Sequence, residues 1–152
     1  MNIERVIAKN RRALLTLDVE EKIEAGIALL GTEVKSIKEG RVSFKDSYVR
    51  IEDGEAYLVN LDIGPYPNAH FGNHERMRRR KLLLHKRQIL RLQGKLSEKG
   101  YTAVPLTIYI NDRGLIKVEI GVGKGKKLYD RRRKLKEKDL KRRIEREVKY
   151  GY

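Results

Sequence analysis

Basic charge in this sequence is concentrated in two segments, and this distribution limits which part of the chain can form a folded core. Residues 76–87 hold seven Lys and Arg and no acidic residue, and residues 124–149 hold fourteen against five Asp and Glu. The formal net charge is +15, so the rest of the chain sums to −1. A basic run is typical of a solvated face, but charge gathered this completely favours an anionic partner, nucleic acid first and an acidic membrane second.

The composition excludes several classes of protein. The chain has 152 residues, 39% hydrophobic and 7% aromatic, which suits one small core but not a large buried catalytic cavity. The sequence has no cysteine, so disulfide scaffolds, thiol chemistry and cysteine-containing zinc sites are excluded. No apolar run approaches the ~20 residues that span a bilayer, and the first residues lack the apolar region of a signal peptide. We therefore expect a cytoplasmic protein without a membrane partner.

Apolar, β-branched and alternating segments predict six short strands, at residues 13–19, 23–30, 48–52, 55–61, 102–110 and 115–122. The polar residues 20–22 predict a break between the first two. Asp53-Gly54 predicts a tight hairpin between the third and fourth, because Gly accepts a positive φ without penalty. Residues 111–114 predict a second hairpin turn.

Two segments have helical patterns. Residues 32–38 predict a short helix with Thr32 as its N-cap, and residues 82–96 predict a longer one that ends before Gly100. Short strands with two or three helices are typical of a mainly β domain that closes, fully or partly, into a small antiparallel barrel. We predict an OB-like antiparallel β-barrel with about three flanking helices.

The composition changes after Gly123, which predicts a division into a barrel at residues 1–123 and a basic tail at residues 124–152. Acid-before-base pairs four residues apart recur in the tail, but each stabilises a helix by only ~0.2–0.5 kcal/mol. We therefore predict a tail that is largely disordered when free and helical when bound.

Motifs for catalysis are weak. His70 and His74 lie four apart, but they follow a proline-rich turn rather than a helix, so we predict no metal site. The alternating Gly121, Gly123 and Gly125 lack the context of a phosphate-binding loop and indicate a flexible exit from the last strand. We predict a protein that is not an enzyme and needs no cofactor.

Of the functions considered so far, binding to nucleic acid is the one that remains. OB-type folds hold nucleic acid with cations and aromatic rings, and Tyr129 lies between two pairs of basic residues. Its ring suits stacking on a base, or packing on the barrel edge.

Several segments resemble one family closely, the small protein B (SmpB) family, whose partner is transfer-messenger RNA (tmRNA). These segments run in order at spacings like those of the family, at residues 10–13, 24–27, 31–36, 46–49, 54–56, 73–74, 80–86, 99–102, 105–106 and 125–132. The resemblance implies an OB-like barrel and a non-enzymatic role in trans-translation. The body would bind the tRNA-like domain of tmRNA and support its charging by alanyl-tRNA synthetase. The complex would then travel with elongation factor Tu to a stalled ribosome.

The resemblance also implies two sets of site residues. Those tied to tmRNA binding, or placed beside such positions as phosphate contacts, are Asn10, Arg11, Arg12, Glu24, Arg80, Lys81 and Leu83. Those that would contact small-subunit ribosomal RNA near the decoding centre, as the tail enters the empty mRNA channel, are Lys124, Lys126, Lys127, Tyr129, Asp130, Arg131 and Arg132.

One departure from the family pattern concerns the first predicted strand. The family usually carries a His-acidic-Tyr triplet where this chain has Leu15, Thr16 and Leu17, so any RNA contact from those groups is missing here. Two other functions stay open from the residues alone. One is a structural ribosomal RNA-binding protein, and the other is an RNA-modifying enzyme, against which the lack of candidate nucleophiles counts.

Overall fold

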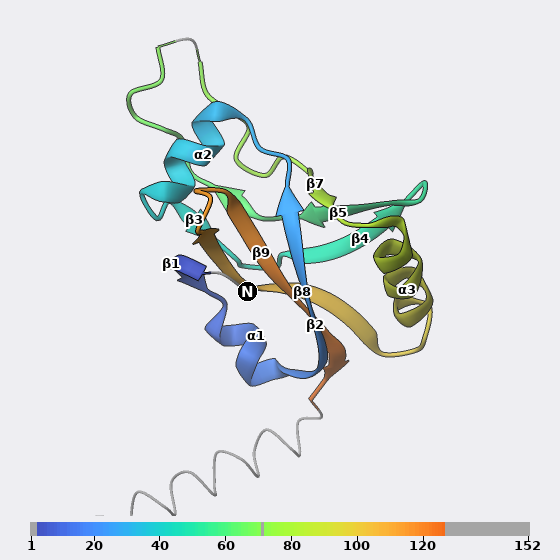
Figure 1. Ribbon diagram of the computed structural model, residues 1–152. Helices are drawn as coiled ribbons and strands as arrows, with labels where there is room; N and C mark the ends of the chain where they lie inside the picture. The colour runs from blue at the N-terminus through green and yellow to red at the C-terminus, as the bar shows by residue number, and fades with distance from the viewer. Residues whose placement is uncertain (1–2, 71, 127–152) are drawn as a thin grey trace, which may run out of the picture.

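The computed structural model describes residues 3–70 and 72–126. Along the chain its elements are β1 (Ile3–Lys9), α1 (Arg11–Thr16), β2 (Leu17–Ile27), α2 (Gly31–Lys38), β3 (Val42–Ser43), β4 (Tyr48–Glu52), β5 (Glu55–Val59), β6 (Asp62–Ile63), β7 (Arg80–Leu83), α3 (Lys86–Leu96), β8 (Tyr101–Asn111) and β9 (Ile116–Gly125) (Figure 1). The prediction of a mainly β, antiparallel domain with about three helices is confirmed for the described residues.

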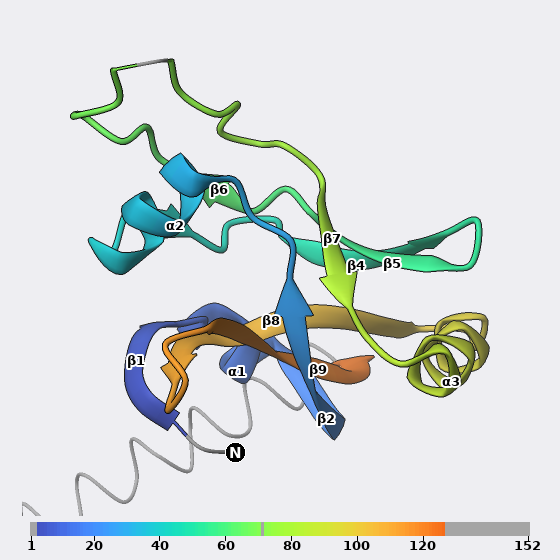
Figure 2. The same ribbon diagram turned by 45° about the horizontal axis from the view of Figure 1, so that its top comes forward.

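One curled antiparallel sheet organises the domain. Its strand order is β1-β8-β9-β2-β7-β5-β4, and β3 pairs separately with β6. Figure 2 shows β8 and β9 in one layer and β4 and β5 in another, with β2 and β7 running between them. The end strands β1 and β4 do not pair with each other in this part of the chain, so the closed barrel of the sequence-based prediction is not confirmed.

The core fills the space inside this curl. Inward residues of the strands include Leu58, Leu82, Ile108, Val118 and Ile120, all with no exposed surface. Helix α3 closes one side through Ile89 and Leu92, which belong to the same cluster. Burial of such a side chain contributes about 1.5–3 kcal/mol to stability. Because successive side chains of a strand point to opposite faces, burial of these residues places their neighbours on the outer face of the sheet.

The strand predicted at residues 13–19 was wrong for its first part, which is helical. Residues 11–16 form helix α1 rather than a strand, and β2 then runs unbroken from Leu17 to Ile27 through the polar residues 20–22. Asn10 explains the helix, because its Oδ1 accepts a hydrogen bond from Ala13 N at 3.2 Å and caps the first turn. Strand β1, which the sequence pattern did not predict, pairs with β8 along the edge of the sheet.

The helix predicted at residues 82–96 begins later, at Lys86. Residues 80–83 instead form β7, in which buried Arg80 and Leu82 alternate with exposed Lys81 and Leu83. The predicted helix at 32–38 is confirmed as α2, although Leu30 rather than Thr32 is its N-cap residue. The Asp53-Gly54 hairpin is also confirmed, with a positive φ at both residues.

Two of the alternating glycines are buried inside β9 instead of forming a flexible exit. A Cβ at Gly123 would lie 2.0 Å from the carbonyl oxygen of Asp18, and one at Gly121 would lie 2.6 Å from Leu106 Cδ1. The close approach coincides with a register shift in β2 between Val19 and Glu21. Strand β9 continues to Gly125, two residues past the boundary that the composition predicts.

We expect Gly123→Ala to lower the free energy of unfolding by about 3 kcal/mol, because the new methyl group meets backbone that cannot move aside. Gly125→Ala is the matched control on the same strand, because a Cβ there meets open space, and it should change stability by less than about 0.5 kcal/mol. Urea unfolding of the two variants measures the difference. Equal midpoints would contradict the close packing of β9 against β2.

Candidate nucleic-acid interface

Helix α1 presents two exposed arginines from a fixed base. Asn10 anchors the helix to β8 through Nδ2, which donates to the Pro105 carbonyl at 2.8 Å, and through its backbone N–H, which donates to the Leu106 carbonyl at 2.7 Å. Arg11 and Arg12 follow on the exposed side. The side chain of Asn10 is therefore occupied within the fold, where it fixes the start of the helix that carries Arg11 and Arg12.

The end of β9 lies beside α1. Gly125 pairs with Leu17, and the backbone N–H of Lys126 donates to the Thr16 carbonyl at 2.8 Å. Figure 1 shows the end of β9 next to the start of β2. Lys124 is exposed, and its Nζ lies 5.0 Å from the centre of the Tyr101 ring. The other predicted ribosome contacts, at Lys127, Tyr129, Asp130, Arg131 and Arg132, fall outside the described residues.

An aromatic and basic cluster near Lys124 was missed by the sequence-based prediction. The Tyr101 ring lies under two ammonium groups, because Lys95 Nζ is also 4.4 Å from its centre. The Tyr101 hydroxyl donates to Glu20 Oε1 at 3.0 Å, and this hydrogen bond raises the pKa of Tyr101. The sequence contained a signal for this cluster, the tyrosine at the start of β8 and the basic end of β9. The two segments can be placed opposite each other only when the register of the sheet is known, which pairs Tyr101 with Lys124.

Glu24 lies further along β2, where it is exposed and accepts a hydrogen bond from the Tyr109 hydroxyl. Tyr109 has no exposed surface, and its burial, together with the hydrogen bond to Glu24, raises the pKa of Tyr109 well above its ordinary value. The hydroxyl therefore keeps its proton at neutral pH and holds the carboxylate of Glu24 in place at the surface.

Lys81 and Leu83 project from the outward face of β7. Lys81 pairs with Glu55 at 3.5 Å, while Leu83 leaves 55% of its surface exposed opposite Gly26 of β2. Leu83 borders a hollow of about 240 Å³ that is lined by Gly26, Ile27, Leu29, Val34, Gly114, Leu115, Ile116 and Lys117. An exposed leucine beside an apolar hollow is suited to contact with a base or a ribose.

Arg80 does not belong to any surface, which corrects its prediction as a phosphate contact. It has no exposed surface, and its Nε donates to Glu33 Oε2 at 2.6 Å. Its remaining nitrogens donate to the carbonyls of Leu61 at 2.5 Å, Glu75 at 3.2 Å and Arg76 at 3.1 Å. The guanidinium therefore holds β7 against α2 and the 61–76 segment, and it is inaccessible to RNA.

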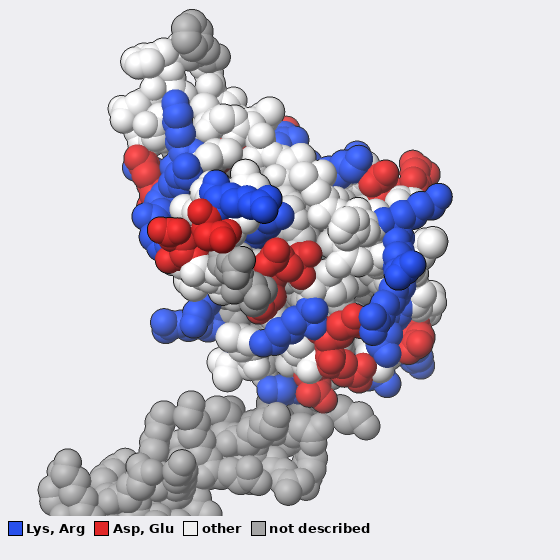
Figure 3. All heavy atoms as spheres, in the orientation of Figure 1, with Lys and Arg blue, Asp and Glu red and all other residues white. Residues whose placement is uncertain are grey.

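The predicted residues form two groups rather than one. Glu24 lies seven positions after Leu17 on β2, a distance of roughly 23 Å along an extended strand, and Leu17 lies beside α1. One group comprises α1 and the end of β9, and the other comprises Glu24, Lys81 and Leu83. On the face seen in Figure 3, acidic side chains lie beside basic ones over α2 and α3.

Residues 3–70 and 72–126 offer no other kind of site that the sequence raised. In this part of the chain no group of three or more His, Cys, Asp or Glu side chains is placed to hold a metal ion. None of its helices has the length and apolar character needed to cross a membrane. His74 is buried, and its ring nitrogens contact Thr32 Oγ1 at 2.8 Å and the Ile63 carbonyl at 2.9 Å, so it is part of the scaffold.

Comparison with known proteins gives a consistent result. The family model described as SmpB protein matches residues 7–150. An SsrA-binding protein of Aquifex aeolicus is 59% identical over 144 residues, which cover 94% of this chain and 91% of that protein. One from Coprothermobacter proteolyticus is 52% identical over 151 residues, with 97% and 99% coverage. The solved structure described as "tmRNA-SmpB: a journey to the center of the bacterial ribosome" is 52% identical, with a TM-score of 0.69 and coverage of 81% and 85%.

Proposed function

This chain belongs to the SmpB family, and from that membership we propose that it is an RNA-binding adaptor that delivers tmRNA to stalled ribosomes for trans-translation. It is a binding protein rather than an enzyme. The observation that carries the proposal is the match across residues 7–150, which spans both the sheet and the basic tail. The relatives named for binding SsrA, and a solved tmRNA-SmpB structure set in the ribosome, support the same role.

In this proposal the sheet binds the tRNA-like domain of tmRNA. Arg11 and Arg12 neutralise phosphates, and Asn10 caps the helix that carries these two arginines. A second contact along β2 and β7 is formed by Glu24, Lys81 and Leu83. The exposure of these side chains supports the assignment, apart from Asn10, which acts through the cap. We also propose that the curled sheet is an open relative of the OB-like barrel.

The tail would act on the ribosome. Lys124, Lys126, Lys127, Tyr129, Asp130, Arg131 and Arg132 are proposed to contact small-subunit ribosomal RNA as the tail occupies the empty mRNA channel near the decoding centre. The body then corresponds to residues up to about the end of β9. Alanyl-tRNA synthetase and elongation factor Tu would meet the protein only through tmRNA, and delivery takes place in the cytoplasm, where ribosomes are.

A gel-shift titration of the full chain against tmRNA tests the proposal. Total tRNA serves as competitor, and the titration is repeated at two salt concentrations. We expect tight binding that survives competition at the higher salt, because shape-specific contacts depend less on released counterions than phosphate attraction does. Binding that tRNA removes equally well and that collapses with salt would contradict tmRNA recognition and favour a structural ribosomal RNA-binding protein.

We expect Leu83→Asp to weaken tmRNA binding roughly tenfold, about 1.4 kcal/mol, because it places a carboxylate where β7 faces RNA. Leu90→Asp is the matched control, since Leu90 is a similarly exposed leucine, at 59%, on the outer side of α3. The two variants carry the same charge change. Equal dissociation constants in the gel shift would remove β7 from the proposed tmRNA surface.

A further inference from the structure

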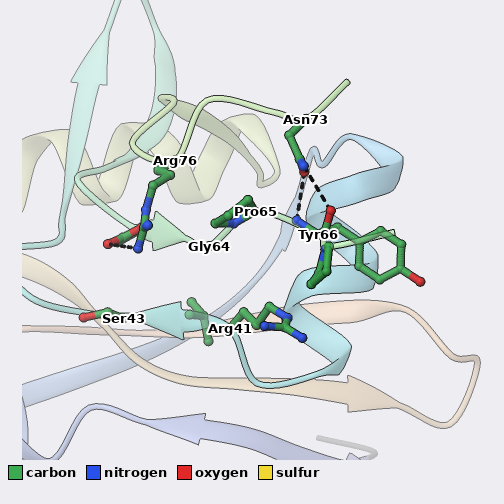
Figure 4. Close-up of a pocket in the computed structure, with 10 residues that line it drawn as sticks. Arg41, Ser43, Gly64, Pro65, Tyr66, Asn73 and Arg76 are labelled. Carbon is green, nitrogen blue, oxygen red and sulfur yellow. Dashed lines mark hydrogen bonds and ion pairs between the residues drawn. The ribbon is translucent and has the colours of Figure 1, made fainter. Parts of the chain in front are cut away.

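A pocket lies beside β3, and its lining differs from both proposed RNA contacts. It has a volume of about 550 Å³ and is bounded by Arg41, Val42, Ser43, Asp62, Gly64, Pro65, Tyr66, Pro67, Asn73 and Arg76. None of these residues belongs to the sets proposed above. Figure 4 shows Pro65 between Arg76 and Tyr66, with Arg41 and Ser43 across from them beside β3.

Hydrogen bonds within the chain hold the walls of this pocket. The Asn73 side chain closes the base of the 66–73 loop, because its Oδ1 accepts from Tyr66 N at 2.8 Å and its Nδ2 donates to the Tyr66 carbonyl at 3.0 Å (Figure 4). The Gly64 N–H donates to the Arg41 carbonyl at 2.9 Å and joins the loop to the floor. The pocket is therefore built before any ligand arrives, which lowers the cost of binding.

The lining combines flat apolar surface with cations. Pro65, Pro67 and Tyr66 supply the rings, and Arg41 and Arg76 supply the cations. Lys35, outside the lining, places its ammonium group 5.4 Å from the centre of the Tyr66 ring. Asp62 fixes Arg76 through Nε at 3.0 Å and Nη2 at 3.2 Å, and Glu39 holds only Nε of Arg41 at 2.9 Å. Arg41 lines the pocket, and within residues 3–70 and 72–126 its terminal nitrogens have no hydrogen-bond partner, so they can donate to a ligand.

We propose that this pocket takes one unpaired nucleotide of an RNA strand, with its base against Pro65 and Tyr66 and its phosphate on Arg41. The volume lies within the range of about 300–1,000 Å³ for sites that enclose small ligands, which suits one nucleotide and not a duplex. Stacking on rings beside arginine is how proteins bind unpaired bases. The choice of RNA as the ligand rests on the proposed function, and the pocket adds a contact separate from the two already assigned.

Photo-crosslinking of the full chain tests this inference. The probe is a uridine hexamer with one 4-thiouridine, and the adducts are mapped by mass spectrometry. We expect adducts on residues 64–67, and Arg41→Gln should reduce their yield about fivefold relative to adducts on the tail. Arg50→Gln is the matched control, because Arg50 is also exposed and also pairs through Nε with one glutamate, Glu52, at 2.9 Å. It should change the yield less than about twofold.

Three results would overturn the inference: no adducts at the pocket, equal yields for the two variants, or displacement of the hexamer by uridine monophosphate at equal concentration. The last would mean a site for free nucleotides. The tmRNA gel shift is run on the same variants. Tight tmRNA binding without pocket adducts rejects the pocket alone, whereas loss of tmRNA binding by the unaltered chain rejects the proposed function.

Discussion

Ending the chain at Lys126 should abolish the tagging of proteins on stalled ribosomes while weakening tmRNA binding by less than about threefold at moderate salt. The cut keeps all of β9 and the hydrogen bond from Lys126 N to the Thr16 carbonyl, so the sheet and α1 stay in place. It removes residues 127–152, which carry twelve Lys and Arg against five Asp and Glu. A reconstituted translation reaction on a message without a stop codon measures tagging, and a gel shift measures affinity.

A charge-matched control separates the identity of the tail from its charge. A chain in which residues 127–152 keep their composition in scrambled order retains the electrostatic attraction to RNA, so its tmRNA affinity should equal that of the native chain even at low salt. We expect it to fail in tagging, because Tyr129 and its neighbours have moved. Normal tagging by the scrambled chain would show that charge alone suffices. An equal loss of tmRNA binding after truncation would refute the division between body and tail.

Glu33→Gln should lower the free energy of unfolding by about 3–5 kcal/mol, because it leaves the buried guanidinium of Arg80 without its counterion. Glu33 and Arg80 both have no exposed surface. Oε1 of Glu33 accepts from Leu30 N at 2.7 Å and from Arg78 Nη2 at 2.5 Å, and Oε2 accepts from Arg80 Nε at 2.6 Å. The carboxylate thus caps α2 and joins it to β7 at the same time.

The control for this variant is Glu39→Gln, which breaks the exposed pair with Arg41. An exposed pair contributes about 0–1 kcal/mol, so its urea midpoint should hardly move. If both variants lost the same free energy of unfolding, the buried Glu33–Arg80 pair would contribute no more to stability than the exposed Glu39–Arg41 pair. A large loss for Glu33→Gln together with weaker tmRNA binding would further show that the position of β7, and so of Leu83, depends on this pair.

The same carboxylate makes stability depend on pH. Burial alone would raise the pKa of Glu33, but hydrogen bonds from Arg78, Leu30 and Arg80 outweigh it, so the pKa lies below its ordinary value. A group with a lowered folded pKa contributes stability above its unfolded pKa and loses it as the pH falls through the folded pKa. We expect the native chain to lose stability in the acid range below the ordinary glutamate pKa, and Glu33→Gln to lack that part of the decline.

Local signals predicted the parts of the fold that local interactions decide. The Asp53-Gly54 hairpin and the α2 helix depend on turn and helix chemistry within a few residues, and both were predicted. The apolar run at the N-terminus misled, because Leu14 and Leu15 are exposed on α1, where the Asn10 cap outweighs strand propensity. Leu17, in the triplet that departs from the family pattern, is buried at the start of β2, so it packs the core instead of facing RNA.

The candidate site was predicted less completely, because a basic run does not reveal which of its cations is buried. Arg80 lies within the most basic segment of the body, yet it pairs with Glu33, 47 residues earlier in the chain. The alternation of residues 80–83 contained the signal, since a strand there places Arg80 and Leu82 on the same inward face. The pocket beside β3 could not be predicted, because it forms where the 61–76 segment returns over residues 41–43.

The anchorage of β9 has a mechanical consequence. The strand is hydrogen-bonded along its length to β2 on one side and to β8 on the other, and its last residues lead directly into the basic tail. A pull along the axis of β9, away from a body held on another RNA, would load both ladders in shear, so that many hydrogen bonds would share the force. If the body and the tail are bound to two large partners that move relative to each other, the sheet can therefore stay folded under the tension between them.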